Sequence, residues 1–350
     1  MTDAPAPTVA PSVAPPGPWA AWRLRGMRRR LLWRAWRSRR DLDPVRVAVP
    51  ADRDAILAVA VVRDEAERLP HWLAHHRALG VDHFLVVDNG STDGTGALLA
   101  DQADVSLWRT EASYRASRFG MDWANRLLMR FGHRRWCLTL DADEALVIPH
   151  HGSRTLRDLA AHLEVTGRDA LGALMLDLYP EGPVGAAPYR PGTPFETALP
   201  LFDPSGYRAV RQRPGLNLWV QGGPRDRLFW RGAPARAPTL NKLPFVRWNR
   251  RWAYRNSTHS LLPPRLNLLW DGPGDPRTSA VLLHAKLLPS IAAKSAEELN
   301  RRQHFGDPDL HAPNHRQLME GPVFAHPGSA RYEGWAQLER LGLMARGDWT

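Results

Sequence analysis

The sequence predicts an α/β fold with a mainly parallel sheet and flanking helices. From Ile56 onward, short apolar runs alternate with amphipathic stretches, in the order ILAVAVV, RLPHWLAHHRALG, HFLVVD, GTGALLADQ and VSLWRT. This βαβαβ order is typical of parallel strands joined by crossover helices. Polar motifs follow the apolar runs, and in such sheets ligands bind off the carboxyl ends of the strands. With 350 residues and 43% hydrophobic content, the chain can bury a sizeable core.

The chain begins with two segments that precede this pattern. Residues 1–18 are rich in proline and alanine, and we expect them to be disordered. Residues 19–50 form a basic amphipathic segment, in which nine arginines between positions 19 and 40 alternate with tryptophan and leucine. Such a helix either lies on an anionic membrane surface or packs on the domain with its arginines solvated. Nucleic-acid binding is less favoured, because no reader motif accompanies the arginines.

The domain itself divides into two halves and an extension. In residues 51–150, a helix over Arg118–Phe131 leads to a fourth strand, WCLTLD. In residues 151–305 we expect a helix over Leu156–Leu163, a strand at LGALMLDLY, and then loops with short strand-like runs at LFW, LPFVRW, STHSLL and VLLHAKLL. Residues 306–350 form the expected C-terminal extension. The second half is predicted to supply loops and antiparallel strands that cover a site.

Composition narrows the class of partners. The net charge of +11 favours partners that carry phosphate, such as a nucleotide, an anionic lipid or nucleic acid. The only cysteine, Cys137, lies in an apolar run, so the sequence offers no intramolecular disulfide and no cysteine-built metal site. No run approaches the roughly 20 apolar residues of a membrane span, and the first residues lack a signal core. We therefore expect a cytoplasmic protein, peripheral at the inner face of the plasma membrane if residues 19–40 bind it.

Three carboxylates crowd the end of the fourth strand, in CLTLDADEALVIP. Like charges this close are unfavourable unless a cation or a group of donors lies among them. A divalent ion, Mg²⁺ or Mn²⁺, is held by a few carboxylates together with water and substrate phosphate oxygens. We therefore predict that Asp141 and Asp143 bind a metal ion that in turn binds a diphosphate.

Two longer stretches carry a family resemblance. The segments VVRDEAERLPHWLAHHRALGVDHFLVVDNGSTDGT and SRFGMDWANRLLMRFGHRRWCLTLDADE resemble the nucleotide-sugar-binding half of family 2 glycosyltransferases, which have the GT-A fold. More narrowly, they resemble a bacterial branch with the LDADE motif. The resemblance covers about a quarter of the chain strongly, and more weakly the later segments GGPRDRLF, LNKLPFVRW, STHSL and LLHAK. One departure is Asp64, where the branch usually has asparagine.

The resemblance implies roles for residues of the first half. Arg63, Asp64 and Glu65 would line the nucleotide pocket, Asp88 would hydrogen-bond the uracil or other base, and Arg118 would contact the nucleotide. The motif DNGSTDGT also fits an Asx-type turn that caps a helix, and this alternative stays open.

The acidic motif of the fourth strand matches the DXD motif of the family. Asp141 would then bind the ribose or sugar, and the metal would be held by Asp141 and Asp143. A short DAD motif also arises by chance, so the order and spacing of all the motifs carry the argument.

The second half must supply the acceptor site and, for an inverting enzyme, a base. We predict Asp226 in GGPRDRLF as that base, kept ionised by the neighbouring Arg225 and Arg227, with Glu181 as the next candidate. The alternative for Asp226 is a surface salt bridge.

Two further residues lie in VLLHAKLL. His284 is the predicted additional metal ligand, with His259 as its rival, and a buried core histidine is the competing interpretation. Lys286 would share a strand face with His284 and could neutralise the leaving diphosphate, whereas a surface lysine is as good an interpretation.

The predicted function is metal-assisted transfer of a sugar from a nucleotide-diphosphate sugar, with UDP favoured, to a hydroxyl of a glycan or glycolipid. Two other classes stay open. A sugar nucleotidyltransferase uses a related sheet and a metal, but it usually has a glycine-rich basic loop after the first strand, which RDEAE is not. A membrane or nucleic-acid adaptor would use residues 19–40 and leave the sheet without activity.

Overall fold

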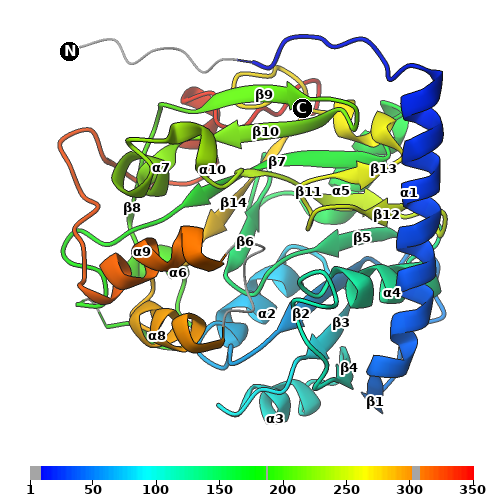
Figure 1. Ribbon diagram of the computed structural model, residues 1–350, viewed down its shortest axis with the longest axis horizontal. Helices are drawn as coiled ribbons and strands as arrows, with labels where there is room; N and C mark the ends of the chain where they lie inside the picture. The colour runs from blue at the N-terminus through cyan, green and yellow to red at the C-terminus, as the bar shows by residue number, and fades with distance from the viewer. Residues whose placement is uncertain (1–8, 187, 302–307) are drawn as a thin grey trace.

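A computed structural model describes residues 9–186, 188–301 and 308–350 (Figure 1). Within these residues, one sheet of nine strands runs through the molecule in the order β1-β4-β3-β2-β5-β11-β7-β14-β6. Its strands are β1 (Asp43–Arg46), β2 (Leu57–Val62), β3 (His83–Asp88), β4 (Val105–Arg109), β5 (Trp136–Thr139), β6 (Glu144–Val147), β7 (Ala170–Asp177), β11 (Asn241–Arg247) and β14 (Ala280–His284).

The sheet is mainly parallel, as the sequence predicts. Parallel pairing joins β4, β3, β2 and β5 in the first half and β7 with β14 in the second. β11 lies between β5 and β7 and pairs antiparallel with both, so β7 and β14 run in the same direction as the strands of the first half. β1 and β6 are antiparallel edge strands. The predicted α/β fold class is confirmed.

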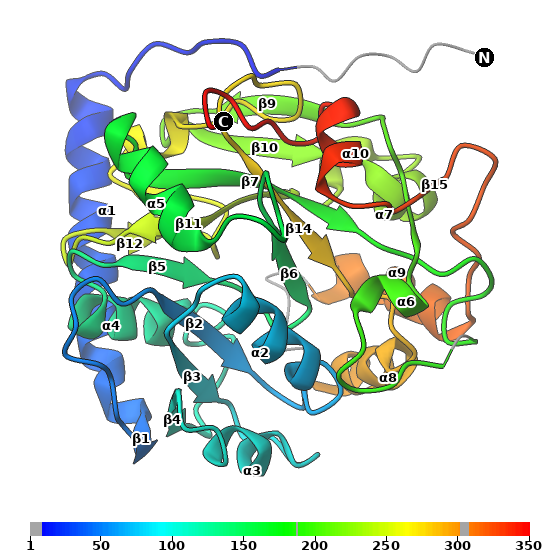
Figure 2. The same cartoon turned by 180° about the vertical axis from the view of Figure 1, so that it is seen from behind.

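Helices cover both faces of the sheet (Figures 1 and 2). The main helices are α1 (Pro18–Arg37), α2 (Leu69–Ala78), α3 (Thr95–Ala100), α4 (Met121–Phe131), α5 (Leu156–Val165), α7 (Gly223–Phe229), α8 (Ile291–Arg301), α9 (Pro308–Met319) and α10 (Trp335–Arg340). Residues of β2 alternate between the two faces. Ala58 and Ala60 pack with α2 and α5 in one apolar cluster, whereas Leu57 and Val59 pack with α4 in another. Figure 2 shows α2 and α5 in front of the sheet.

Short elements complete the second half. The remaining helix is α6 (Phe195–Ala198), and the two-stranded sheets pair β9 (Arg208–Gln212) with β10 (Asn217–Gln221), β12 (Ala253–Tyr254) with β13 (Leu261–Leu262), and β15 (Ala330–Arg331) with β8 (Leu201–Phe202). Three 3₁₀ turns cover Ser38–Asp41, Pro234–Arg236 and Pro264–Leu268.

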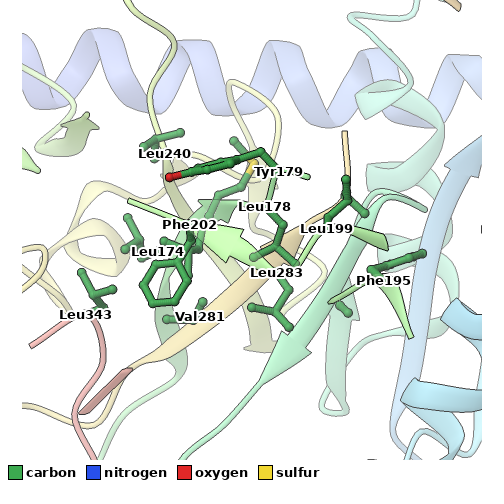
Figure 3. Close-up of a cluster of buried hydrophobic side chains, with 14 of the residues drawn as sticks. Leu174, Leu178, Tyr179, Phe195, Leu199, Phe202, Leu240, Val281, Leu283 and Leu343 are labelled. Atoms are coloured by element: carbon green, nitrogen blue, oxygen red, sulfur yellow. The ribbon is translucent and has the colours of Figure 1, made fainter. Parts of the chain in front are cut away.

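A third apolar cluster holds the second half to the C-terminal residues (Figure 3). Leu174 of β7 and Val281 of β14 are fully buried there, and Leu343 from the C-terminal region packs with them. Residues 308–350 therefore form part of the domain core. The predicted boundary between residues 305 and 306 lies outside the described residues.

Some predicted elements are absent or shorter than expected. The sequence predicts a strand at LFW, but Leu228 and Phe229 are the last two residues of helix α7. A helix can form here because Pro224 lies in its first turn, where the missing backbone N–H would have no partner within the helix in any case. STHSLL contributes only the two residues of β13. By contrast, LPFVRW forms most of β11, and VLLHAKLL forms β14 as far as His284. Cys137 is buried, as expected, and its thiol is free.

The N-terminal residues are only partly described. Residues 1–8 of the predicted disordered segment lie outside the described residues. Residues 9–17 have no regular secondary structure, yet Ala10 is buried and its backbone N–H donates to the carbonyl of Asp271. In the part of the chain that the structure describes, no helix is long and apolar enough to cross a membrane.

Candidate active site

The loops that follow β2 and β3 are locked together by hydrogen bonds. The N–H of Asp64 donates to Ser91 Oγ at 3.0 Å, and the N–H of Glu65 donates to Thr95 Oγ1 at 2.8 Å. Asp64 Oδ1 accepts the N–H of Thr92 at 2.6 Å. Asp64 has φ +51°, a left-handed conformation that Asp and Asn tolerate better than most residues. This explains why aspartate can stand at this turn, where the family that the sequence resembles usually has asparagine.

Asp88 organises the second of these loops. Its Oδ1 accepts the N–H and the hydroxyl of Ser91, at 2.9 and 2.5 Å. An Asx-type contact is formed instead by Asp93, whose Oδ1 accepts the N–H of Thr95 at 3.0 Å, while the N-cap residue of α3 is Gly94, without a side-chain cap. The other oxygen of Asp88 faces Gly96, where an added Cβ would lie 2.9 Å away. Asp88 is almost fully buried. A contact from Asp88 to a nucleotide base stays a prediction.

Helix α8 closes this side of the site. Lys294 Nζ lies 2.5 Å from Glu65 Oε1, and Arg68 pairs with the other oxygen of Glu65 at 2.9 Å. Arg63 donates to the carbonyl of Asn89 at 2.9 Å. The predicted trio at residues 63–65 is thus held in a cationic surrounding, next to the carboxyl end of β2.

The acidic segment crosses the carboxyl edge of the sheet. It leaves β5 near the middle of the sheet and enters β6 at the far edge, so residues 140–143 pass the ends of β7 and β14 and the start of β11. The β14 ladder then places His284 opposite Glu144 on one side and opposite Asp177 on the other. Residues 107 and 140 positions apart therefore meet at one edge.

Lys242 is a cation that pairs with two of the three crowded carboxylates. It is buried at the start of β11, and its Nζ lies 3.0 Å from Asp141 Oδ2 and 2.9 Å from Glu144 Oε1. Burial disfavours the charged ammonium, but both carboxylates outweigh that effect and raise the pKa of Lys242. Glu144 has no exposed side-chain surface, and burial raises its pKa to about 7 despite Lys242. Two of the crowded carboxylates, Asp141 and Glu144, are thus paired with a cation of the same protein.

The third carboxylate belongs to a chain of alternating charges. Asp143 Oδ2 lies 3.2 Å from His284 Nε2, and His284 Nδ1 lies 2.5 Å from Asp177 Oδ1. Asp177 also accepts two hydrogen bonds from Arg225, at 2.7 and 3.0 Å. His284 and Asp177 are almost fully buried, so these contacts are little screened by water.

The charged side chains in this row shift one another's pKa values. Burial disfavours the imidazolium of His284, but the facing Asp143 and Asp177 outweigh burial and raise its pKa. Burial likewise disfavours the Asp143 carboxylate, yet His284 holds the pKa of Asp143 well below its usual range. Without another cation, a proton on His284 Nε2 bridges the two groups.

We tested whether these residues fit a divalent metal. Among the described residues, no group of three or more His, Cys, Asp or Glu side chains is arranged to hold an ion. Two donors nevertheless face one another, Asp143 Oδ2 and His284 Nε2, and Asp177 fixes the other ring nitrogen, as an outer partner of a metal-bound histidine does. Mg²⁺ and Mn²⁺ need few protein ligands when a diphosphate supplies others. The pair fits such an ion, whereas Asp141 would first have to leave Lys242.

Two other predicted residues, Lys286 and Arg118, have different surroundings. Lys286 follows His284 by two residues, and burial together with Arg225 lowers its pKa. Arg118 instead joins the two halves, because it donates to Asp122 Oδ1 of the first half at 3.0 Å and to the carbonyls of Tyr254 and Arg255 in the second. A contact from Arg118 to a nucleotide stays a prediction.

The base predicted from the sequence has different partners from those expected. Asp226 forms a bidentate pair with Arg208, at 2.6 and 3.1 Å. Its neighbours do not pair with it, because Arg225 pairs with Asp177 and Arg227 with Asp203. Successive residues of a helix point about 100° apart, so α7 sends these side chains to different partners.

The two rival residues can also be placed. Glu181 is exposed and pairs with Arg331 at the surface. His259 Nδ1 lies 2.5 Å from the carbonyl of Asn241, and burial lowers the pKa of His259 to about 3. His284 is therefore the histidine that joins the acidic motif.

Lys242 and Asp177 were not among the residues predicted from the sequence, and Arg225 was predicted only as a neighbour of Asp226. Lys242 and Asp177 are single charges in otherwise apolar runs, LNKLPFV and LGALMLD, and a lone charge in a buried strand requires a partner. That signal was present in the sequence. The identity of the partners was not, since it depends on the order of the strands.

Comparisons with known proteins give partial matches. No family model matches the chain. A polyprenol monophosphomannose synthase of Mycolicibacterium smegmatis is 32% identical over 152 residues, which cover 42% of this chain and 53% of that protein. A glycosyltransferase family 92 protein of Oryza sativa subsp. japonica is 26% identical over 133 residues, or 36% of this chain and 21% of that protein. The chain thus matches about half of one relative and about a fifth of the other.

Among solved structures, the mannosyltransferase PcManGT from Pyrobaculum calidifontis, in complex with GDP-Man and Mn²⁺, is 18% identical, with a TM-score of 0.28. The likeness covers 45% of this chain and 47% of that one. A putative glucose-1-phosphate thymidylyltransferase from Bacillus anthracis is 9% identical with a TM-score of 0.29, over 85% of this chain and 97% of that one. The named sequence relatives support a glycosyltransferase, while membership of family 2 stays a prediction.

Proposed function

We propose that this protein is a glycosyltransferase that moves a sugar from a nucleotide-diphosphate sugar to a hydroxyl acceptor. The observation that carries the proposal is the chain of alternating charges Asp143, His284, Asp177 and Arg225 at the carboxyl edge of the sheet. Carboxylates and cations interleaved at such an edge suit a ligand that is itself a metal-bound diphosphate. The matched sequence relatives, which are glycosyltransferases, support the same conclusion.

The residues divide into three roles. Arg63, Asp64 and Glu65 line the nucleotide side together with Asp88. Asp143 and His284 would hold Mn²⁺ or Mg²⁺, and the bound ion would neutralise the diphosphate as it leaves.

The remaining groups prepare the site for that charge. Asp177 orients the His284 ring through Nδ1, so that Nε2 faces Asp143. Lys242 pairs with both Asp141 and Glu144 and so reduces the negative charge beside the site. Lys286, whose pKa burial lowers, provides a cation that a diphosphate would stabilise by pairing with it. Asp226 stays the proposed base for the acceptor hydroxyl, and it would have to exchange its pairing with Arg208 for the acceptor.

The donor and the acceptor are proposals from chemistry and from the named relatives. One matched relative is, by its name, a polyprenol monophosphomannose synthase, so a mannose donor such as GDP-mannose joins the UDP-sugars as a donor to test. The acceptor is a glycan or a glycolipid.

The test is a panel of UDP- and GDP-sugars, assayed for Mn²⁺-dependent hydrolysis and for nucleotide binding by calorimetry. We expect one donor to be hydrolysed slowly to free sugar and nucleoside diphosphate, with activity lost on chelation. The Asp143→Ala variant should lose metal-dependent binding, whereas Asp101→Ala, on the exposed end of α3, should retain it. Normal Mn²⁺-dependent affinity in Asp143→Ala would refute the metal assignment.

A second panel, of nucleoside triphosphates with sugar phosphates, separates sugar transfer from nucleotidyl transfer. A nucleotidyltransferase would release pyrophosphate from a nucleoside triphosphate and a sugar phosphate, and would not hydrolyse a sugar nucleotide to free sugar. Pyrophosphate release without sugar release would therefore replace the proposal with that alternative.

A further inference from the structure

Helix α1 packs on the domain with one face and exposes four tryptophans on the other. Leu24, Leu31 and Ala35 are buried, against a cluster that includes Ala253 and Leu262. The exposed tryptophans are Trp19 (68% exposed), Trp22 (58%), Trp33 (54%) and Trp36 (44%). At about 100° per residue, these four side chains fall within an arc of about 100°, on the side of the helix away from the core.

Exposed indole rings of this kind indicate a binding surface. A tryptophan has a large apolar ring with one N–H donor, so it is stabilised at a boundary between an apolar phase and water. Trp19 and Trp22 stack on each other with ring centroids 5.0 Å apart, which covers part of their surface but leaves both rings largely in solvent. Figure 1 shows α1 along one edge of the molecule, where no other element covers its outer side.

The charge around the tryptophans is of one sign. Residues 19–40 contain nine arginines and no acidic residue. Among the described residues, Arg34 is the member of this set that pairs with a carboxylate, that of Asp122 at 2.7 Å. The others are left to interact with an external anion. A surface that combines exposed indoles with unpaired arginines is complementary to an anionic membrane surface.

A groove at the end of α1 extends this surface. It has a volume of about 150 Å³ and is lined by Arg39, Arg126 and Arg130 together with Trp108 and Phe131. The Arg39 guanidinium stacks on the Trp36 ring at 3.7 Å, so the groove is continuous with the tryptophan face.

The three arginines of the groove lie close enough to repel one another. Burial lowers the pKa of Arg126, and its neighbours Arg130 and Arg39 lower it further. No carboxylate pairs with Arg39, Arg126 or Arg130 within the part of the chain that the structure describes. The groove therefore offers cations without a partner beside an apolar wall.

We propose that α1 and this groove bind an anionic phospholipid membrane, with the tryptophans inserted at the interface and a lipid phosphate held by Arg39, Arg126 and Arg130. The apolar wall of Trp108 and Phe131 accommodates the start of the acyl region. The proposed lipid site is separate from the acidic motif, because α1 packs mainly on α4, on β12 and on the turn Ser38–Asp41. It anchors the domain at the surface where a lipid-linked acceptor would reside.

The test is sedimentation of the full chain with vesicles of phosphatidylcholine alone or of equal amounts of phosphatidylcholine and phosphatidylglycerol. We expect binding to the anionic vesicles, weakened by salt. Arg126→Gln/Arg130→Gln should weaken it by about fivefold for each arginine, the factor that corresponds to about 1 kcal/mol per charge. Trp22→Ala/Trp33→Ala should weaken it on the order of tenfold, since buried apolar area sets this part of the affinity.

The matched control is Arg157→Gln/Arg340→Gln, which removes two exposed arginines of α5 and α10 from surface ion pairs. This variant should bind vesicles as the unaltered chain does. The donor-hydrolysis rate of all variants should be unchanged, and circular dichroism checks that each is folded.

Each other outcome would overturn the proposal or one part of it. Equal loss in the control would reduce the effect to net charge, and equal binding to neutral vesicles would refute the arginine site. Retained binding in the tryptophan variant would refute insertion. Inorganic phosphate or glycerol phosphate that saturates the groove without vesicles would make it a soluble-anion site. Tighter binding to a nucleic-acid duplex than to anionic vesicles would replace the membrane with that partner.

Discussion

Lys242 offers the sharpest test of the charge arrangement, through the substitution Lys242→Met. The change keeps most of the side-chain volume but removes the cation from Glu144, which is fully buried, and from the half-exposed Asp141. Loss of one partner of a buried pair costs about 3–5 kcal/mol, because the other charge stays buried without compensation. We therefore expect the free energy of unfolding to fall by that amount at pH 8.

The loss should depend on pH with a defined sign. Burial already raises the pKa of Glu144 to about 7, above its usual value of 4.5, and removal of Lys242 raises it further. A carboxyl whose pKa is raised on folding contributes stability below its unfolded pKa and loses it as pH rises through the folded pKa. At pH 5 Glu144 is protonated in the variant, so we expect a much smaller loss at pH 5 than at pH 8.

The assay is urea unfolding followed by circular dichroism at both pH values. A double variant, Lys242→Met/Glu144→Gln, removes the buried charge altogether and should recover most of the stability at pH 8. If the single variant loses the same stability at pH 5 and pH 8, and the double variant recovers none, Glu144 is not the partner that Lys242 stabilises.

Three further predictions address other groups. Asp226→Asn should lower the kcat of transfer on the order of 10²-fold and leave nucleotide affinity unchanged, whereas Arg208→Gln should lower only the stability of the fold. Transfer at a normal rate by Asp226→Asn would make Asp226 a salt-bridge residue. Burial lowers the pKa of His75 from 6.5 to about 4, so the stability that it contributes above pH 6.5 should be lost as the pH falls toward 4, by about 3 kcal/mol. Thermal unfolding measured against pH should therefore show a smaller loss over this range in His75→Gln. Gly96→Ala should weaken nucleotide binding with or without metal, since the new Cβ would lie 2.9 Å from Asp88 Oδ2; unchanged affinity in calorimetry would show that this oxygen is not needed.

The first half of the fold follows from the sequence because its contacts are local. β2, α2, β3, α3 and β4 are consecutive, each strand pairs with the next in the chain, and the polar loops at 63–65 and 88–95 meet across a single pair of strands. A pattern of alternating runs is then enough to predict both the parallel sheet and the place of the site.

The second half could not be derived in the same way. β11 enters the sheet between β5 and β7, and its Lys242 meets Asp141 from 101 positions away. Nothing in the local pattern of NKLPFVR specifies this pairing. Asp226 shows the same limit, since adjacent arginines in the sequence indicated a partner that helix geometry sends elsewhere.

The two halves are coupled by charge as well as by strand order. The carboxylates of the acidic motif come from the first half, and the groups that neutralise them, Lys242 and His284, come from the second. Because Glu144 is fully buried, the first half could not hold it ionised by itself at neutral pH. Folding of the second half therefore sets the protonation of the motif. A ligand that replaces the proton between Asp143 and His284 acts on contacts that join both halves, so binding of such a ligand should stabilise the whole domain against unfolding.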